Sequence, residues 1–136
     1  MIVVGVDFSD GSAAAVALAR QLGTEGGGEI HVVHVVEGAR AGDSLKTRSR
    51  AWLSDLAIDP ETVEIRHGIP WVELVRAGED RGATFLVAGT HGRAGFQSVR
   101  LGSTATHVAL RSRTPVVLVP PPRSLSKRPG MSRPVS

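Results

Sequence analysis

Three glycines and a serine in the second half of the chain have the spacing of an anion site. Gly89, Gly92 and Gly102 are separated by two and by nine residues, and Ser103 follows directly. Glycine allows positive φ and leaves no Cβ between an anionic oxygen and the main-chain amides. A helix that begins at Ser103 would add its first amides, which have no partner within the helix. The pattern predicts a cradle for phosphate groups.

Short apolar runs alternate with helical patterns on either side of this loop. We expect strands at residues 2–6, 30–36, 63–66, 84–90 and 116–119, and helices at 12–22, within 39–57, at 71–80 and at 103–111. Gly23 is expected to end the first helix and Pro70 to open the third. Five strands in strict alternation with helices predict a parallel sheet with right-handed crossovers and helices on both faces.

Asp7 follows the first strand and has two interpretations. Ligands of such sheets bind at the carboxyl ends of the strands, where both Asp7 and Gly89 lie, so the carboxylate could hold a ribose hydroxyl. An acid after a strand can instead cap the next helix, for which Ser9 and Asp10 are also candidates. The position of Asp7 at the sheet edge favours the ligand.

Net charge does not support nucleic-acid binding, although the sequence pI is about 10.5. Four of the 16 basic residues lie in residues 121–136, which contain no acid, so the preceding 120 residues carry 12 basic and 13 acidic side chains. A nearly neutral folded part lacks the basic face that nucleic acids require, and 4% aromatic residues leave little to stack on bases. Residues 1–120 are therefore expected to form one domain, followed by a basic, flexible tail at 121–136.

The remaining composition points to a cytoplasmic protein. There is no cysteine, which excludes a disulfide framework and a thiolate metal site. The chain starts directly with a strand-like run, without a leader pattern, and no apolar stretch approaches the length of a membrane span. We expect neither a membrane partner nor a nucleic-acid partner.

The histidines and tryptophans are mostly assigned to structure. His31 and His34 are three apart on a strand and point to opposite faces, so they cannot chelate one ion. His91, inside the glycine loop, is either a neighbour of a phosphate or a residue that folds the loop. Trp52 and Trp71 are interpreted as core or interface anchors rather than as stacking partners of a cofactor.

Together these segments resemble a known family. The runs VGVDFSDGSAAAVALA, HVVHVV and LVAGTHGRAGFQSVRLGSTATHVALRSRTPVVLVP are similar to those of ATP-binding universal stress proteins, over roughly residues 2–119. The resemblance implies a doubly wound, five-stranded sheet of order 3-2-1-4-5 with ATP at the ends of strands one and four. It also implies a homodimer built by pairing the last strands. Ile69 departs from the family pattern, since an aspartate usually caps the helix there.

The resemblance also assigns roles to individual residues. Asp7 would hold the ribose, with Gly5 and Val6 beside it, and Val35 would meet the adenine. Ala88 and Gly89 would flank the ribose and the α-phosphate. The phosphates would be surrounded by Gly92, Gly102, Ser103 and Thr104, and His91 and Arg93 are within reach by position.

The sequence favours holding a nucleotide over cleaving it. The P-loop pattern, the G-x-S-x-G elbow and the dinucleotide G-x-G-x-x-G fingerprint are all absent, and no lysine lies near the loop. We therefore expect a regulatory stress protein that binds ATP together with Mg²⁺, with AMP and cyclic AMP as alternative ligands. Slow ATP hydrolysis or phosphotransfer near His91, Arg93 or Ser103 is one alternative function. A dimeric scaffold that binds no nucleotide is another.

Overall fold

The computed structural model describes residues 1–26, 28–37, 47–91 and 102–122, with side chains from residue 49 onward in the third of these segments. Strands and helices alternate along them. In chain order they are β1 (Ile2–Val6), α1 (Asp10–Gly26), β2 (Ile30–Val36), α2 (Thr47–Asp55), the 3₁₀ turn η1 (Pro60–Thr62), β3 (Glu64–His67), α3 (Pro70–Asp80), β4 (Phe85–Gly89), α4 (Ser103–Arg111) and β5 (Val116–Val119).

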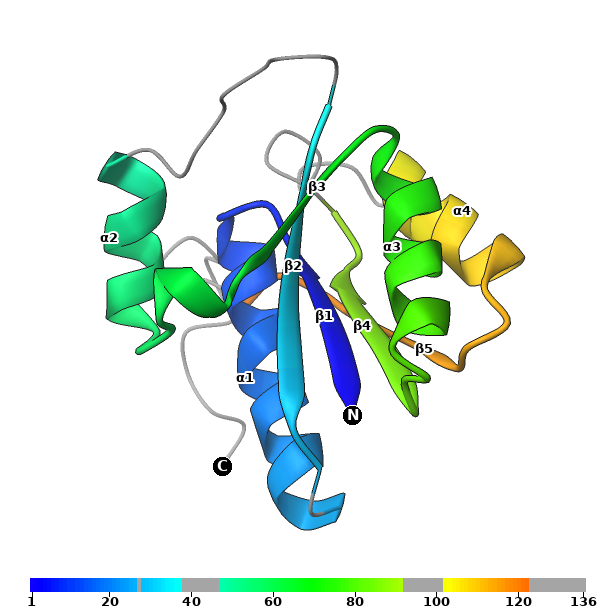
Figure 1. Cartoon of the computed structure of the whole chain (residues 1–136), viewed down its shortest axis with the longest axis horizontal. Coiled ribbons are helices and arrows are strands. Elements are labelled where there is room, and N and C mark those ends of the chain that lie inside the picture. Colours follow the sequence, from blue (N-terminus) through cyan, green and yellow to red (C-terminus); the bar gives the residue numbers. More distant parts are fainter. Residues whose placement is uncertain (27, 38–46, 92–101, 123–136) are drawn as a thin grey trace, which may run out of the picture.

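The five strands form one parallel sheet of order β3-β2-β1-β4-β5 (Figure 1). This confirms the doubly wound arrangement and the strand order expected from the resemblance. From β1 the chain winds outward to β3, then returns across the sheet to β4 and β5. The winding direction therefore reverses between β1 and β4, and the strands β1 to β4 run toward the top of Figure 1.

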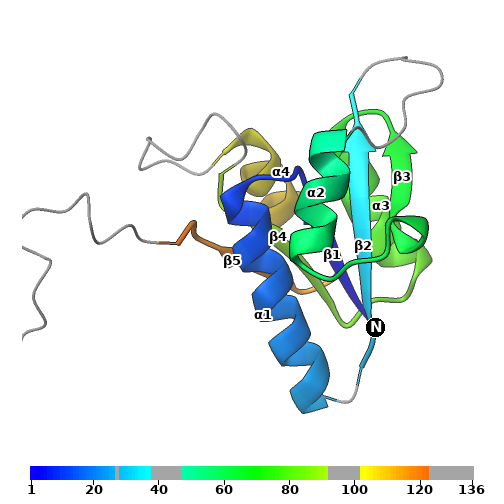
Figure 2. The same cartoon turned by 90° about the vertical axis from the view of Figure 1, so that its left-hand side faces the viewer.

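Helices cover both faces of the sheet (Figures 1 and 2). On one face α1 and α2 pack on the strands, and this core includes Val4, Val16 and Leu53. On the other face α3 and α4 enclose a second core, which includes Val3, Leu74 and Val108. Because β1 is buried along its whole length, its carboxyl end is fixed by packing from both sides. In the part of the chain that the structure describes, no helix has the length and apolar character needed to cross a membrane.

The first helix is longer than expected. It starts at Asp10, with Ser9 as its cap, and continues to Gly26, so the prediction that Gly23 ends it is wrong. Gly23 is buried within the helix, where an added Cβ would lie 3.0 Å from the carbonyl oxygen of Gly28. Because Gly23 has no side chain, the chain can pass close to the helix on its way to β2. The glycine serves this approach rather than helix termination.

Smaller differences concern the other boundaries. Strand β3 begins one residue later than expected, because the amide of Val63 still closes η1 by donating to Pro60. Strand β4 is one residue shorter at each end than the expected 84–90. Helix α2 occupies Thr47–Asp55 of the expected 39–57, and residues 39–46 of that range lie outside the described residues. Helix α3 has Ile69 at its cap position without a side-chain hydrogen bond, as the departure from the family pattern suggested.

The β3 edge of the sheet carries a network of charged side chains. Arg66 lies 2.7 Å from Glu64, 3.0 Å from Glu73 and 3.3 Å from Asp80, and His31 Nε2 lies 2.7 Å from Glu64 Oε1. Burial raises the pKa of Glu64, but hydrogen bonds from His31 and Arg66 outweigh it and hold that pKa below its ordinary value of 4.5. Charge on this strand also discourages pairing with another sheet.

The lowered pKa of Glu64 predicts an acid-sensitive contribution to stability. Because the folded pKa lies below the unfolded one, this contribution is complete above about pH 4.5 and is lost as the pH falls through the folded pKa. We expect Glu64→Gln to lower the free energy of unfolding at pH 7 by on the order of 1 kcal/mol. In urea denaturation series from pH 7 to pH 3, the difference between the two proteins should shrink with acid. A constant difference would contradict this assignment.

Candidate functional site at the carboxyl edge

Asp7 is held by two serines in the turn between β1 and α1. Its Oδ1 accepts hydrogen bonds from the Ser9 amide at 3.1 Å, from Ser9 Oγ at 2.5 Å and from Ser12 Oγ at 2.6 Å. The Asp7 amide donates to Ser12 Oγ at 2.8 Å, and the Ser12 amide donates to Ser9 Oγ at 3.1 Å. Three donors on one oxygen fix the orientation of the carboxylate. Asp7 thus fixes the turn before α1, while Ser9, one of the residues considered as a cap, caps the helix through its Oγ.

The first turn of α1 packs closely against the end of β4. A Cβ added to Gly11 would lie 3.2 Å from the carbonyl oxygen of His91, and one added to Gly89 would lie 3.4 Å from the backbone of Gly11. These backbones can approach because both positions lack side chains. The ends of β1 and β4 are thereby joined through the start of α1.

Thr90 closes the glycine loop. Its carbonyl accepts from the Gly102 amide at 2.8 Å, and its own amide donates to Val119 at the end of β5 at 2.9 Å. Gly102 is in extended conformation and is the cap residue of α4. Because glycine has no side chain to cap the helix, the first amides of α4 have no side-chain partner from the cap residue at this edge. The structure therefore brings Gly89 and Gly102 to the same place. Ser103 and Thr104 follow there, whereas Gly92 and Arg93 lie outside the described residues.

Other predicted site residues are partly explained by packing. Gly5 is buried beneath α3, where an added Cβ would lie 2.7 and 2.8 Å from the two δ carbons of Leu74. Val6 belongs to the core under α1, Val35 packs against the core under α3 and α4, and Ala88 is buried in β4. These residues pack in or against the two cores beneath the carboxyl ends of the strands.

The histidines take separate structural partners. His34 Nδ1 lies 2.8 Å from the carbonyl oxygen of Val6, whereas His31 pairs with Glu64, so the two do not share a ligand position. His91 Nδ1 lies 2.8 Å from Thr90 Oγ1. His107 stacks on Trp71 with ring centroids 5.2 Å apart. Among the described residues, no group of three or more His, Asp or Glu side chains is placed to hold a metal ion.

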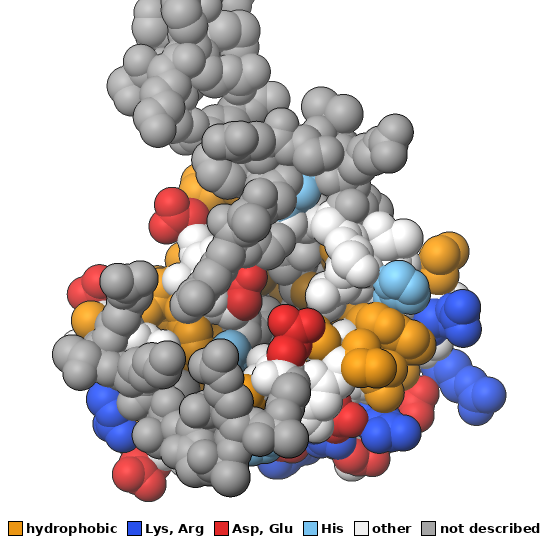
Figure 3. Space-filling model, turned by 90° about the horizontal axis from the view of Figure 1, so that it is seen from above, with side chains coloured by type: hydrophobic (Ala, Val, Ile, Leu, Met, Phe, Trp, Pro, Cys, Tyr) orange, Lys and Arg blue, Asp and Glu red, His pale blue; other side chains and the backbone are white. Residues whose placement is uncertain are grey.

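Seen from above, the edge combines acidic, histidine and apolar side chains. In Figure 3, acidic and histidine side chains lie near the middle of the view, and hydrophobic side chains flank them on both sides. Such a mixture suits a ligand with an apolar ring and polar hydroxyl groups better than a purely charged partner.

Sequence reasoning missed three contributions to this edge. Ser12 was not singled out, although the spacing D-x-S-x-x-S places two hydroxyls one turn apart beside the carboxylate. Gly11 was not recognised as a point of close approach, although it directly follows the cap region. Thr90 joins β4, β5 and α4 through its backbone, and such a role has no signal in the sequence because any residue type has the same backbone groups.

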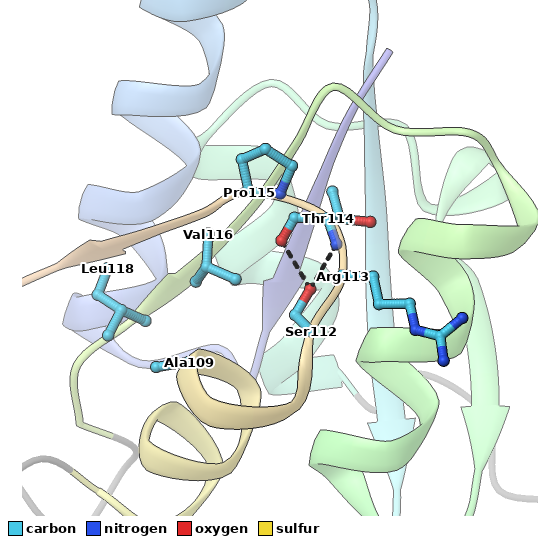
Figure 4. Close-up of a pocket in the computed structure, with 7 residues that line it drawn as sticks. All are labelled: Ala109, Ser112, Arg113, Thr114, Pro115, Val116 and Leu118. Carbon is cyan, nitrogen blue, oxygen red and sulfur yellow. Dashed lines mark hydrogen bonds between the residues drawn. The ribbon is translucent and has the colours of Figure 1, made fainter.

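A separate groove lies along β5. It has a volume of about 380 Å³ and is lined by Val116 and Leu118 of β5, Ala109 of α4 and the residues 112–115 between them (Figure 4). Ser112 Oγ accepts from the Thr114 amide and donates to the Thr114 carbonyl, which shapes the turn between α4 and β5. This groove is built from residues outside the carboxyl-edge site.

The fold is that of a doubly wound α/β domain whose winding direction reverses between β1 and β4, the place where such sheets generally bind ligands. Residues 1–120 match the model of the universal stress protein family. The chain belongs to the universal stress protein family.

Relatives and solved structures agree with this assignment. Universal stress protein MJ0531 of Methanocaldococcus jannaschii is 28% identical over 145 residues, covering 90% of this chain and 82% of the relative. The structure of MJ0577 from the same organism superposes with a TM-score of 0.73 at 22% identity, covering 90% of this chain and 97% of that one, and supports the fold. A universal stress protein solved in complex with cAMP has a TM-score of 0.67 at 27% identity, covering 89% and 97%.

The contact between Gly5 and Leu74 predicts a specific packing defect. We expect Gly5→Ala to lower the free energy of unfolding by about 1–3 kcal/mol, because the new methyl group overlaps a buried side chain. Leu74→Ala should itself be destabilising, but it opens space for the methyl group. In a double-mutant cycle followed by urea denaturation, Gly5→Ala should therefore cost less in the Leu74→Ala background. Additive effects would show that the glycine is needed for another reason.

Proposed function

We propose that this chain is a nucleotide-binding stress-response protein that holds ATP at the carboxyl ends of β1 and β4. The observation that carries the proposal is the hydrogen bond from the Gly102 amide to Thr90, which brings Gly89, Gly102 and the start of α4 close together. Main-chain amides at such a point suit phosphate oxygens. Asp7, fixed by Ser9 and Ser12 at the adjoining strand end, suits a ribose hydroxyl.

The assignment of roles follows the predicted site. Asp7 takes the ribose with Gly5 and Val6 beneath it, Val35 meets the adenine, and Ala88 and Gly89 flank the α-phosphate. Gly92, Gly102, Ser103 and Thr104 surround the phosphates, with His91 and Arg93 within reach. Mg²⁺, which keeps several waters and prefers phosphate oxygens, would be held chiefly by the nucleotide. The cAMP complex of a relative supports the adenosine part of this proposal.

Thermal unfolding tests whether the nucleotide binds. At a Mg-ATP concentration of about 100 times Kd, the ligand should stabilise the fold by about 2.7 kcal/mol, which corresponds to a rise in Tm on the order of 10 °C. Gly102→Val should abolish the rise but still fold, because the φ of −65° at Gly102 suits any residue. Gly26→Val is the matched control, since a Cβ there meets open space.

The outcome also separates the alternative functions. No rise in Tm with ATP, AMP or cyclic AMP would favour the scaffold that binds no nucleotide. Sustained phosphate release by the purified protein, lost in His91 or Arg93 variants, would favour the slow hydrolase or phosphotransfer enzyme.

We also propose a homodimer that forms through β5. The carbonyls of Pro115 and Val119 accept from β4, so by strand alternation the backbone groups of Val116 and Leu118 face away from the sheet. Together with the groove beside them, they offer a second copy an edge to pair with.

Removal of one outward amide tests this interface. Leu118→Pro deletes a donor on the outer edge and leaves the β4 ladder intact, so we expect the mass in solution to fall from twice 14.3 kDa to 14.3 kDa. Leu118→Ala, which keeps the amide, should remain dimeric in the same light-scattering measurement. A Leu118→Pro dimer would place the interface elsewhere.

A further inference from the structure

The turn that carries Asp7 is attached to β2 and α2 by an aromatic cluster, formed by Phe8, His34 and Trp52. The ring of Phe8 lies 4.4 Å from that of His34 and 5.4 Å from that of Trp52, the latter pair edge to face. The Phe8–Trp52 distance falls in the range of favourable aromatic contacts, and the His34 ring lies at its lower limit. Phe8 is the residue between Asp7 and Ser9, so these contacts act on the centre of the turn.

The backbone of Phe8 has an unusual conformation. Its φ is 64°, a left-handed value that is unfavourable for a residue with a bulky side chain. Such a conformation persists where the surroundings determine it, and it often marks a functional site. Here the surroundings are the rings of His34 and Trp52. The cluster therefore holds the turn in the shape in which Ser9 can reach Asp7.

Hydrogen bonds tie the two ends of the turn to the same neighbours. His34 donates from Nδ1 to the Val6 carbonyl at 2.8 Å, and Trp52 donates from Nε1 to the Ser9 carbonyl at 3.2 Å. The residue after Trp52 is Leu53, which is fully buried and anchors α2 in the core. A displacement of Asp7 or Ser9 must consequently alter the hydrogen bond and the ring contact of Trp52.

We propose that Phe8 and Trp52 are positioning residues of the nucleotide site and that α2 responds when the site is filled. This inference rests on the proposed function, and it adds the element through which occupancy is transmitted. A nucleotide that binds better to one arrangement of the turn shifts α2 with it, and by reciprocity the state of α2 changes the affinity for nucleotide. Helices α3 and α4 lie on the opposite face (Figures 1 and 2), and α4 meets the proposed site through its first residues, Ser103 and Thr104.

The two tryptophans allow a matched test. Trp52 belongs to the cluster, whereas Trp71 lies on α3, stacked on His107. Trp71→Phe leaves Trp52 as the only tryptophan, and Trp52→Phe leaves Trp71. On titration with Mg-ATP, the emission of the Trp71→Phe protein should change with the midpoint found by calorimetry on the same sample. The emission of the Trp52→Phe protein should change less, because Trp71 meets the proposed site only indirectly, through His107 and the Ser103 carbonyl.

A second variant separates positioning from general support of the fold. Phe8→Gly removes the ring but keeps a backbone that accepts positive φ, so the protein should fold. We expect its affinity for Mg-ATP to fall by about 2–10-fold, the effect of losing an aromatic pair, and the Trp52 response to disappear. Phe8→Tyr, which keeps the ring, should retain both the affinity for Mg-ATP and the Trp52 response.

The outcomes distinguish this inference from the proposed function. Calorimetric binding without a change in Trp52 emission overturns the role of α2 and leaves nucleotide binding intact. Equal responses from both tryptophans also overturn it, because the change would then be no larger at α2 than at α3. No heat of binding in any of the folded proteins overturns the proposed function, and the role of α2 with it.

Discussion

The pairing of β1 with β2 on one side and β4 on the other is the constraint on which the carboxyl edge depends. It places the central strand in the core on both faces, so its end cannot shift without disturbing both layers. Asp7 stands on that fixed end, and the start of α1 packs against β4 beside it. The described part of this edge is therefore held in place by the sheet itself.

Backbone groups rather than side chains make most of the edge. Thr90 joins β5 and α4 through its amide and carbonyl, Gly102 supplies an uncapped helix start, and Gly11 and Gly89 permit close approach. Such an arrangement suits phosphate oxygens by its shape and the partial charge of its amides. It is this backbone geometry that supports the proposal of a protein that holds a nucleotide.

The sequence predicted the fold well because its signals are local. Buried strands are continuous apolar runs, Pro70 marks the first residue of α3, and Ser103 the start of α4. Gly23 misled because a glycine inside a helix and one that ends a helix look alike until the neighbouring chain is seen. The contacts of Ser12 with Asp7, of Gly5 with Leu74 and of Phe8 with Trp52 depend on where distant segments meet. Hydrophobic periodicity and residue propensities do not predict such long-range contacts.

Whether a bound nucleotide could move α2 depends on its binding preference compared with the energies of the contacts that hold α2. A ligand shifts an equilibrium only by its differential affinity, and a tenfold preference is worth about 1.4 kcal/mol. The bond from Trp52 to Ser9 and the ring contacts of Phe8 are each of about 1 kcal/mol. The core burial of Leu53 is larger, about 1.5–3 kcal/mol. A nucleotide could thus remake the contacts between α2 and the turn while Leu53 keeps the helix docked, so a small local adjustment is favoured over release of α2.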